Sequence, residues 1–392
     1  MSKISKYILI ILGFIISIDC NATGIEKEKN DTTKQHKNLR FSILGGPGYT
    51  PDFGFLLGGS MLFTFRTDPQ DMELDRSVVP IGFAFMFNGG FNLISRPQFF
   101  FNHDRFRIFG QVIFKNTLDN YYGVGYDTNN SIVRGEETSE YRASNWQINP
   151  ILLWRMGQTD FFGGALVDVS RDYMKSPSEG VQNDPDYIAQ GGDESGLLSM
   201  NTGLGLTISY DTRDIPANAY KGLLLDFKTT FFLDEFGGDS DYTLINLEYR
   251  QFTLLEFMGP RRSLGWMLKT SNSFGDVPVT RMQMIGSPFD IRGYYLGQYR
   301  DKSAHFGLLE YRHMFNTDQT DFWSRLFNRF GFATWGGVGF MGPDLGNIEA
   351  VLPNFGLGLR IEVQPRMNFR IDAGHNPIDG NTLIYFNMTE AF

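Results

Sequence analysis

The 392-residue sequence has one cysteine, Cys20, which excludes a framework of disulfide bonds. Basic residues are also few, with 35 Lys and Arg against 44 Asp and Glu. No basic run follows the first residues, so a nucleic-acid partner is not indicated. Long apolar runs are missing as well. The run from Tyr7 to Ile18 is shorter than the roughly 20 residues that a membrane-spanning helix needs.

The sequence also lacks the motifs of the common enzyme and metal-binding classes. It contains no H-E-x-x-H, P-loop, Gly-x-Ser-x-Gly or dinucleotide-binding pattern, and its five histidines do not have the spacing of metal ligands. A hydrolase site made of His313 or His375 and a serine from another strand is one interpretation. Interfacial or lumenal histidines without a catalytic role are the other. We expect no catalytic residues, no metal and no cofactor.

The first 38 residues are predicted to lie outside the folded domain. An apolar run and a small-residue cleavage site follow Lys3 and Lys6, so residues 1–22 are predicted to be a secretory signal peptide. The acidic residue before Cys20 argues against lipid attachment, because lipoprotein signals have a small residue there. Residues 23–38 are polar and charged, which predicts a disordered periplasmic lead-in.

Aromatic residues are abundant, with 37 Phe and 17 Tyr, and many lie in segments where apolar and polar residues alternate. In residues 353–364, for example, Leu357 and Leu359 alternate with Gly358 and Arg360. This period of two is typical of β-strands with one apolar face. Several of these segments exceed about ten residues, the length that a tilted strand needs to cross a membrane. Because lipid offers no hydrogen bonds, a sheet of such strands must close on itself.

About sixteen alternating segments lie within residues 39–392, most of them before a loop at 276–302. The sequence therefore predicts an all-β fold, a transmembrane antiparallel β-barrel of about 16 strands, as one domain over residues 39–392. The charged face of the strands is predicted to line a polar lumen. The first segment, 39–46, would pair with the last, 382–392, to close the barrel.

The loop that begins at Gly286 is too rich in Gly, Pro and charge for a strand, and Arg292 lies at its centre. An arginine folded into a barrel lumen needs an anionic partner, because an unpaired buried cation is costly. Glu310, in the next predicted strand, is the nearest candidate. The other interpretation is a surface loop with an incidental Arg-Gly turn.

The run Asp290, Ile291, Arg292, Gly293 and Tyr294 resembles the lid-loop signature of the BamA/TamA family, also called the bacterial surface antigen barrels. The resemblance implies that this loop folds into the lumen, where its arginine pairs with acidic residues on the two following strands. Glu310 matches the first acidic position. Thr334 stands at the second, where the family commonly has Asp, so half of the ionic clamp is expected to be missing.

The resemblance covers residues 39–392. Family members usually carry periplasmic POTRA domains before the barrel, and residues 23–38 are too few to form one, so a barrel-only member is expected. Phe386, Met388 and Phe392 share one phase of the last segment. This pattern is similar to the C-terminal signal by which assembly machinery recognises an outer-membrane barrel.

In this family the mechanism depends on a weak seam between the first and last strands, and the sequence permits one. Gly45, Gly46 and Pro47 are predicted to interrupt the first strand early, because glycine offers no side chain and proline no hydrogen-bond donor. A strand edge that is exposed or only briefly paired is a template for the addition of another strand.

The resemblance implies a protein of the outer membrane of a Gram-negative bacterium that assists the insertion, assembly or translocation of other outer-membrane or surface proteins. Its expected partners are outer-membrane lipid, client outer-membrane proteins, and either partner proteins or further copies in a homo-oligomer that replace the missing periplasmic domains. The alternative is a passive structural or channel-forming outer-membrane barrel.

Overall fold

The structure is a computed structural model that describes residues 38–317 and 321–392. The predicted signal peptide and nearly all of the predicted lead-in lie outside the described residues. Residues Leu39–Phe392 form one structural unit. Within the described residues, no helix is long and apolar enough to cross a membrane.

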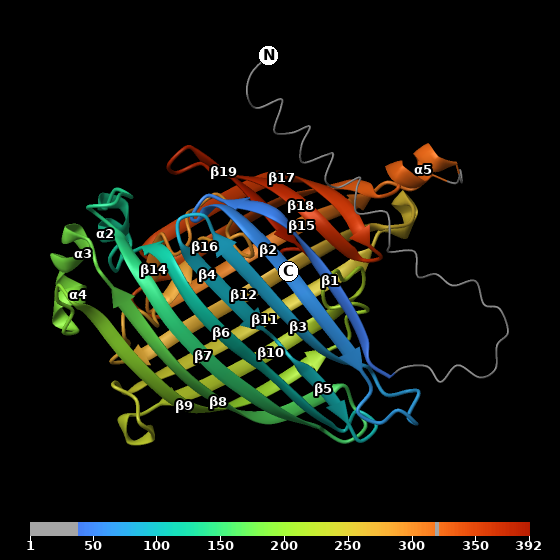
Figure 1. Cartoon of the computed structure of the whole chain (residues 1–392), viewed down its shortest axis with the longest axis horizontal. Helices are drawn as coiled ribbons and strands as arrows, with labels where there is room; N and C mark the ends of the chain where they lie inside the picture. Colours follow the sequence, from blue (N-terminus) through green and yellow to red (C-terminus); the bar gives the residue numbers. More distant parts are fainter. Residues whose placement is uncertain (1–37, 318–320) are drawn as a thin grey trace, which may run out of the picture. The chain divides into compact units, whose positions relative to one another are not determined.

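Strands dominate this unit, and loops with short helices join them (Figure 1). The elements in chain order are β1 (Arg40–Thr50), β2 (Gly54–Phe65), β3 (Ser77–Met86), β4 (Gly90–Ser95), β5 (Gln98–Phe101), β6 (Phe106–Asn120), α2 (Tyr126–Ser131), β7 (Glu140–Arg155), β8 (Phe161–Lys175), α3 (Glu179–Gln182), α4 (Pro185–Ala189), β9 (Gly196–Asp211), β10 (Gly222–Phe232), η2 (Asp234–Phe236), β11 (Tyr242–Leu254), η3 (Glu256–Met258), β12 (Arg262–Gly275), β13 (Gln283–Ile285), β14 (Tyr299–Asp301), β15 (Ser303–Met314), α5 (Phe322–Phe327), β16 (Phe330–Gly342), β17 (Ala350–Gln364), β18 (Met367–Asn376) and β19 (Asn381–Met388). The predicted all-β class is confirmed.

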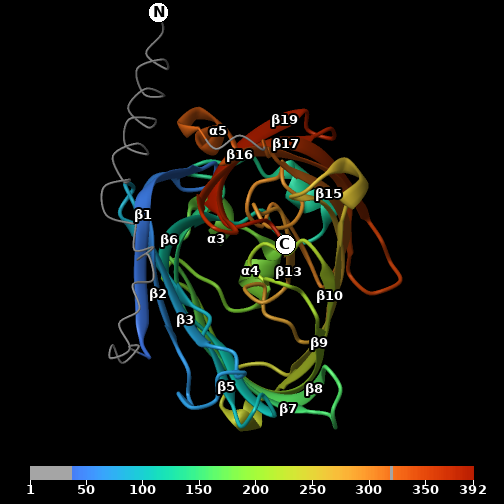
Figure 2. The same ribbon diagram turned by 90° about the vertical axis from the view of Figure 1, so that its right-hand side faces the viewer.

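The long strands form one antiparallel sheet, in which each strand pairs with the next long strand of the chain. β12 pairs with β15 because β13 and β14 form a separate hairpin between them. β4 and β5 each pair with both β3 and β6, so they are two halves of one interrupted strand. The sheet has 17 strands, and β4 and β5 share one position in it. Figure 2 shows the strands wrapped around a central lumen.

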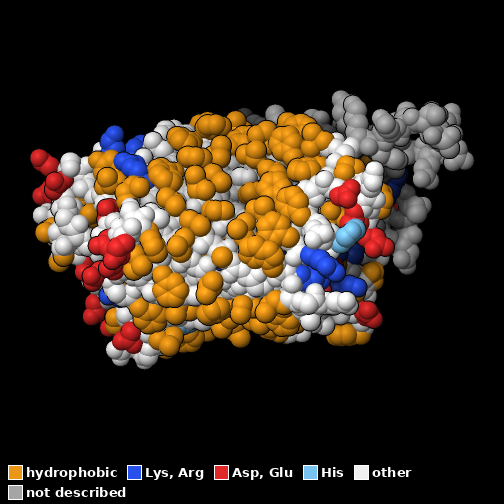
Figure 3. All heavy atoms as spheres, turned by 90° about the horizontal axis from the view of Figure 1, so that it is seen from below, with side chains coloured by type: hydrophobic (Ala, Val, Ile, Leu, Met, Phe, Trp, Pro, Cys, Tyr) orange, Lys and Arg blue, Asp and Glu red, His pale blue; other side chains and the backbone are white. Residues whose placement is uncertain are grey.

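The two faces of the sheet differ in the way that the alternating sequence predicts. On β17, Leu357 and Leu359 are 59% and 41% exposed, whereas Arg360, the residue that follows Leu359, is 1% exposed. Figure 3 shows apolar side chains over the middle of the visible outer face and most charged side chains towards its two ends. An apolar belt around a barrel with a polar interior is the pattern of a membrane-spanning barrel.

Consecutive strands run in opposite directions, so the connections fall alternately at two ends of the barrel. We call one the lid end; it carries the β1–β2 and β18–β19 turns, the β13–β14 hairpin and helices α2, α3 and α4 (Figure 1). The other, the turn end, carries the β11–β12 turn and α5 (Figure 1).

Two predicted strand boundaries are wrong. β1 does not stop at residue 46 but continues through Gly45, Gly46 and Pro47 to Thr50, and it pairs with β2 along its whole length. Proline is tolerated there because a strand at the edge of a sheet does not need every backbone donor. β19 ends at Met388 and not at residue 392.

Candidate functional site

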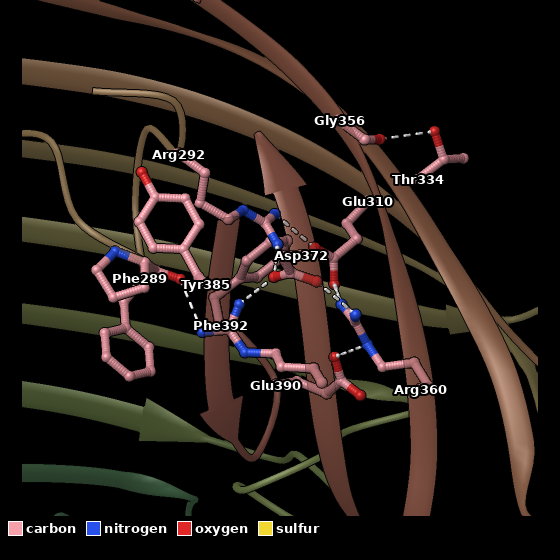
Figure 4. Close-up of polar contacts among 12 residues, drawn as sticks. Phe289, Arg292, Glu310, Thr334, Gly356, Arg360, Asp372, Tyr385, Glu390 and Phe392 are labelled. Atoms are coloured by element: carbon pink, nitrogen blue, oxygen red, sulfur yellow. Dashed lines mark hydrogen bonds and ion pairs between the residues drawn. The ribbon is translucent and has the colours of Figure 1, made fainter. Parts of the chain in front are cut away.

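The loop from residue 286 to residue 298, which we call the lid, places Arg292 against the inner face of the sheet (Figure 4). Arg292 is fully buried; its Nη2 donates to Glu310 Oε2 at 2.6 Å and its Nη1 to Asp372 Oδ2 at 2.8 Å. The guanidinium carbon lies 3.5 Å from the ring centroid of Trp335. Two charge-assisted hydrogen bonds and one aromatic face thus hold the planar guanidinium, which fixes the centre of the lid on the barrel wall.

Arg292 belongs to a larger group of buried ions, shown in part in Figure 4. We call this group the lumenal cluster; its members are Arg292, Glu310, Arg312, Arg360, Arg370, Asp372 and Glu390. Cations and anions alternate through it. Arg312 Nε donates to Glu310 Oε1 at 2.8 Å, Arg360 Nη1 to Asp372 Oδ1 at 2.6 Å and Arg360 Nε to Glu390 Oε2 at 2.8 Å. Arg370 also pairs with Asp372. Buried charges persist only when they are paired in this way.

The lid backbone lies directly on β18 because two glycines meet there. Gly293 has a φ of +111°, and a Cβ added to it would stand 2.9 Å from the backbone nitrogen of Asn376. A Cβ on Gly374 would stand 2.8 Å from the carbonyl carbon of Arg292. A larger side chain at either glycine would therefore push the lid off β18 and move Arg292 away from Asp372.

The other motif residues pack around Arg292. Ile291 and Tyr294 are fully buried in an apolar core that includes Tyr299. Tyr294 Oη donates to the Pro353 carbonyl at 2.9 Å. Burial raises the pKa of the Asp290 carboxyl, because it disfavours the charged form. Together these residues fill the lumen near the lid with side chains.

The expectation that Thr334 leaves half of the clamp missing is wrong. Thr334 points away from the cluster and is exposed, and its hydroxyl donates to the Gly356 carbonyl at 3.1 Å (Figure 4). The second carboxylate for Arg292 is Asp372, which lies on β18 and not on the strand that carries Thr334. The alternation of β18 could have identified Asp372. It has the same inward-facing phase as Arg370, two residues earlier, whereas Phe369 and Ile371 have the opposite phase.

The end of the chain also departs from the prediction. Thr389 has a φ of +67°, and the residues after it leave the sheet for the lumen. Phe392 is therefore buried, its main-chain oxygen accepts a hydrogen bond from Arg312 Nη2 at 2.8 Å, and its ring lies 6.0 Å from that of Phe252. Phe386 and Met388 remain on β19 and are half-buried. The expected common phase of the three residues is thus lost at Phe392.

The seam between β1 and β19 differs from every other boundary in the sheet. Within residues 38–317 and 321–392, no ladder of backbone hydrogen bonds joins these two strands. Two aromatic side chains do meet across the seam: the ring centroids of Tyr49 on β1 and Phe386 on β19 lie 6.3 Å apart, edge to face. Since β19 ends two residues later, the half of β1 that begins at Arg40 lies beyond the end of its neighbour. The predicted pairing of residues 39–46 with β19 is therefore wrong.

The lid is tied to the β1 side of the seam through the β1–β2 turn. The backbone N–H of Leu296 donates to Asp52 Oδ1 at 2.8 Å. Arg134 donates to the carbonyls of Pro51 and Asp52 at 3.0 and 2.8 Å, and its guanidinium lies 4.6 Å from the Tyr295 ring. Burial raises the pKa of the Asp52 carboxyl to about 6, although the Leu296 N–H and Arg134 favour its charged form.

The lid is also tied to the β19 side. Gln298 Nε2 donates to Asp379 Oδ2, in the β18–β19 turn, at 3.1 Å. The hydroxyl of Tyr385, on β19, accepts from the Gly293 N–H at 3.0 Å and donates to the Tyr294 carbonyl at 3.1 Å. We call these contacts on both sides of the seam the clasp. The lid end of the seam is therefore held by side chains where a backbone ladder is absent.

The remaining candidates for chemistry are two histidines and a group of acidic residues. His313 contacts the Tyr311 hydroxyl at 2.9 Å and accepts from Arg262 Nε at 3.3 Å, and His375 contacts the Thr382 hydroxyl at 3.0 Å. In the described part of the chain, no serine hydrogen-bonds to either ring. Asp234, Glu235 and Asp241 bring three exposed carboxylates within reach of one ion. Exposed acidic groups of this kind are common without a metal, and no other feature marks a metal site there.

Comparison with solved structures finds barrels of the same fold. BamA from Haemophilus ducreyi lacking POTRA domains 1–3 matches with a TM-score of 0.58 and 12% identity, over 89% of this chain and 69% of that one. CdiB from Escherichia coli has a TM-score of 0.58 and 10% identity over 91% of this chain. CdiB from Acinetobacter baumannii has a TM-score of 0.53 and 12% identity over 90% of it. This chain covers 63% and 60% of the two CdiB chains. At such identities the likeness shows the fold alone.

The family comparison is more specific. No curated protein matches the sequence. The Omp85 superfamily domain matches residues 95–342, more than half of the chain, and the match includes the lid and Glu310. In general terms, this family match supports an outer-membrane barrel of assembly or translocation. It confirms the BamA/TamA type predicted from the lid sequence, and the chain belongs to the Omp85 superfamily.

Proposed function

We propose that this protein assists the insertion, assembly or translocation of other outer-membrane or surface proteins, in the outer membrane of a Gram-negative bacterium, by opening its β1–β19 seam. The observation that carries the proposal is the missing ladder between these strands in the described residues. Unpaired backbone N–H and C=O groups are costly in lipid. A strand of a client protein that paired with β1 would satisfy them, which is the general mode of strand addition to a free edge.

The two ends of the seam would have different roles. At the lid end, the clasp links the β1–β2 turn to β19 through Asp52 and Tyr385. At the turn end, the first residues of β1 have no neighbour from β19, and Phe41 and Ile43 are 54% and 60% exposed. A client strand would therefore start to pair at the turn end and proceed towards the clasp. The lumenal cluster keeps the lid in place while this happens.

The partners that this proposal requires are outer-membrane lipid, a client outer-membrane protein, and partner proteins or further copies of this chain that deliver the client. The pattern of Phe386, Met388 and Phe392 is proposed to act earlier, as the assembly signal of the unfolded chain. In the folded barrel Phe392 is buried in the lumen, so it would no longer be available to a receptor.

The proposal is tested by locking the seam. Cysteines replace Tyr49 and Phe386 in a Cys20→Ala background and are joined by a short, reducible thiol cross-linker. We expect the unlocked protein in vesicles to accelerate the folding of a client barrel, locking to abolish this effect, and reduction to restore it. The matched control places cysteines at Ser42 and Leu62, which face each other across the β1–β2 ladder, and cross-linking there should change nothing.

The same vesicles discriminate the alternative of a passive barrel. Normal client folding with the seam locked would contradict the proposal. Stable ion conductance without any effect on clients would favour a passive channel. The packed side chains of the lid and of β14, including the fully buried Ile291, Tyr294 and Tyr299, do not favour such a channel.

A further inference from the structure

Six exposed apolar side chains form a patch on the rim of the barrel at the turn end. Phe257 is 86% exposed, Trp323 73% and Phe322 63%, which is unusual for side chains of this size. We call this group the rim patch; its members are Phe257, Met258, Phe322, Trp323, Leu326 and Phe327. Several large exposed apolar side chains on neighbouring turns mark contact with a protein or a membrane.

The rim patch is a built surface that two neighbouring turns share. Asp321 caps α5, since its Oδ2 accepts from the N–H groups of Trp323 and Ser324 at 3.1 and 3.2 Å. Arg261, in the same β11–β12 turn as Phe257, donates from Nη1 to the Asn328 carbonyl at 2.7 Å. The backbone oxygen of Arg261 accepts from the Met314 N–H at 3.1 Å. These contacts hold the β11–β12 turn beside the segment that carries α5.

An aromatic column connects the rim patch to the outer face of the sheet. Phe327 of α5 stacks on Phe315, with centroids 4.6 Å apart and planes 13° apart. Phe315 contacts His313 at 5.4 Å, and His313 stacks on Phe332 at 5.0 Å. His313 and Phe332 lie on the outer face, because the residues next to them, Arg312 and Ala333, are buried on the lumenal side. The rim patch therefore continues the membrane-facing surface beyond the ends of the strands.

The chemistry of this position indicates one occupant. Tryptophan and other aromatic rings concentrate at the boundary between hydrocarbon and water in membrane proteins. Arg325 and Arg329 are exposed on the same segment, where they can reach lipid phosphates. We infer that the rim patch lies in the headgroup region of the leaflet at the turn end and anchors α5 and the β11–β12 turn to phospholipid. The inference rests on the membrane-spanning barrel and is independent of the client-assembly role.

The anchor would fix the depth of one particular part of the barrel. α5 is the next described element after β15, and β15 carries Glu310 and begins two residues after β14 of the lid hairpin. Phospholipid contact at the turn end would thus hold the strand on which Arg292 is anchored. The seam strands β1 and β19 have no comparable helix in the described part of the chain.

Spin labels test this placement directly. Single cysteines at Phe257, Trp323 and Phe327, in the Cys20→Ala chain, carry nitroxides in vesicles of phosphatidylcholine and phosphatidylglycerol. Collision rates with oxygen, which partitions into lipid, are compared with those of a water-soluble nickel complex. Leu345→Cys, at an exposed position of the β16–β17 loop at the lid end, is the water-facing control, and Arg325→Cys reports the polar side of α5.

For the three patch labels we expect an oxygen-to-nickel collision ratio at least about twofold above that of the Leu345 label, with depths in the headgroup region. The Arg325 label should lie nearer water. A ratio equal to that of the Leu345 label would place the patch in water and overturn the inference. Protection from both reagents would also overturn it, because the patch would then be covered by protein. An unchanged gel shift on heating confirms that each labelled barrel is folded.

Discussion

The two sides of the sheet that meet at the seam are built differently. We call strands β15 to β19 the C-terminal wall and strands β1 and β2 the N-terminal wall. On the C-terminal wall, the lumen-facing positions of β15 and β18 carry fully buried ions such as Glu310 and Asp372. On the N-terminal wall, the corresponding positions of β1 and β2 carry small or aliphatic residues such as Leu44, Ser60 and Leu62, which are only half-buried. One wall is therefore packed against the lid, and the lumen-facing side chains of the other are less completely covered.

This difference indicates which wall can move. The lid is bound to the C-terminal wall by paired buried charges, whose separation would leave a charge without a partner. In the described part of the chain, its hydrogen bond to the N-terminal wall is the one from Leu296 to Asp52 in the β1–β2 turn, and Arg134 bridges that turn to the ring of Tyr295. We therefore expect the lid and the C-terminal wall to move together, and the seam to open by movement of β1 and β2.

The largest expected effect comes from breaking the cluster at its centre. Arg292→Ala removes a partner from two buried carboxylates and should destabilise the bound lid by about 3–5 kcal/mol. Hydrogen exchange of residues 286–298 should rise sharply, while the barrel keeps its gel shift on heating. Arg292→Lys, which keeps the charge but loses the fork of donors, should lie between the wild type and the alanine variant. An unchanged lid in the alanine variant would mean that the cluster does not hold it.

A second prediction sharpens the comparison, because the walls differ only on the lumenal side. Leu359→Arg on the C-terminal wall and Leu57→Arg on the N-terminal wall both place a charge on the apolar outer face. Each should lower the free energy of unfolding by about 2–4 kcal/mol near the membrane midplane. Leu62→Arg, on the lumenal face of the N-terminal wall, should cost much less. Urea unfolding in vesicles measures the free energy of unfolding of all three variants. An equal cost for Leu62→Arg would mean that Leu62 does not face the lumen.

The smallest effect concerns the clasp and its dependence on pH. With the clasp closed the pKa of Asp52 is about 6, and in the open, hydrated turn it returns towards the ordinary value of 3.8. Between these values the closed form holds a proton that the open form releases, so closure is favoured as pH falls through 6. The protonated carboxyl still accepts from Leu296. Arg134, Lys115 and Asp119 also act on this carboxyl.

Exchange of the Leu296 amide, corrected for the intrinsic effect of pH, measures the clasp. Protection should rise between about pH 7 and pH 5. Asp52→Asn keeps an acceptor oxygen without the charge, so it should be well protected and independent of pH. Protection that falls on acidification of the wild type would contradict the assignment of the raised pKa to the closed clasp.

The barrel could be predicted from the sequence because its signals are local. The alternation of Leu357 and Leu359 with Gly358 and Arg360 specifies both a strand and its two faces. The proximity of Arg292 to Glu310 could also be predicted, because the two residues are close in the sequence: Arg292 is in the lid and Glu310 is on β15, the next long strand. In the structure, Arg292 Nη2 lies 2.6 Å from Glu310 Oε2.

The other contacts of the lid could not be read in the same way. Asp372 reaches Arg292 because the curvature and stagger of the barrel bring β18 beneath the lid, and no spacing in the sequence encodes this. The hydrogen bond from Leu296 to Asp52 depends on closure of the whole sheet. The sequence predicts a break at Pro47 because proline has a strong local effect, but the ladder with β2 carries β1 past it. The inward turn at Thr389 has no local signal.

The central claim is that side chains, and no backbone ladder, join β1 to β19. Solid-state NMR of the protein in lipid bilayers tests it most directly, because amide–amide cross-peaks report paired strands. We predict such cross-peaks between β1 and β2 and between β18 and β19, and none between residues 40–49 and 381–388. A set of cross-peaks in antiparallel register between those two ranges would contradict the claim.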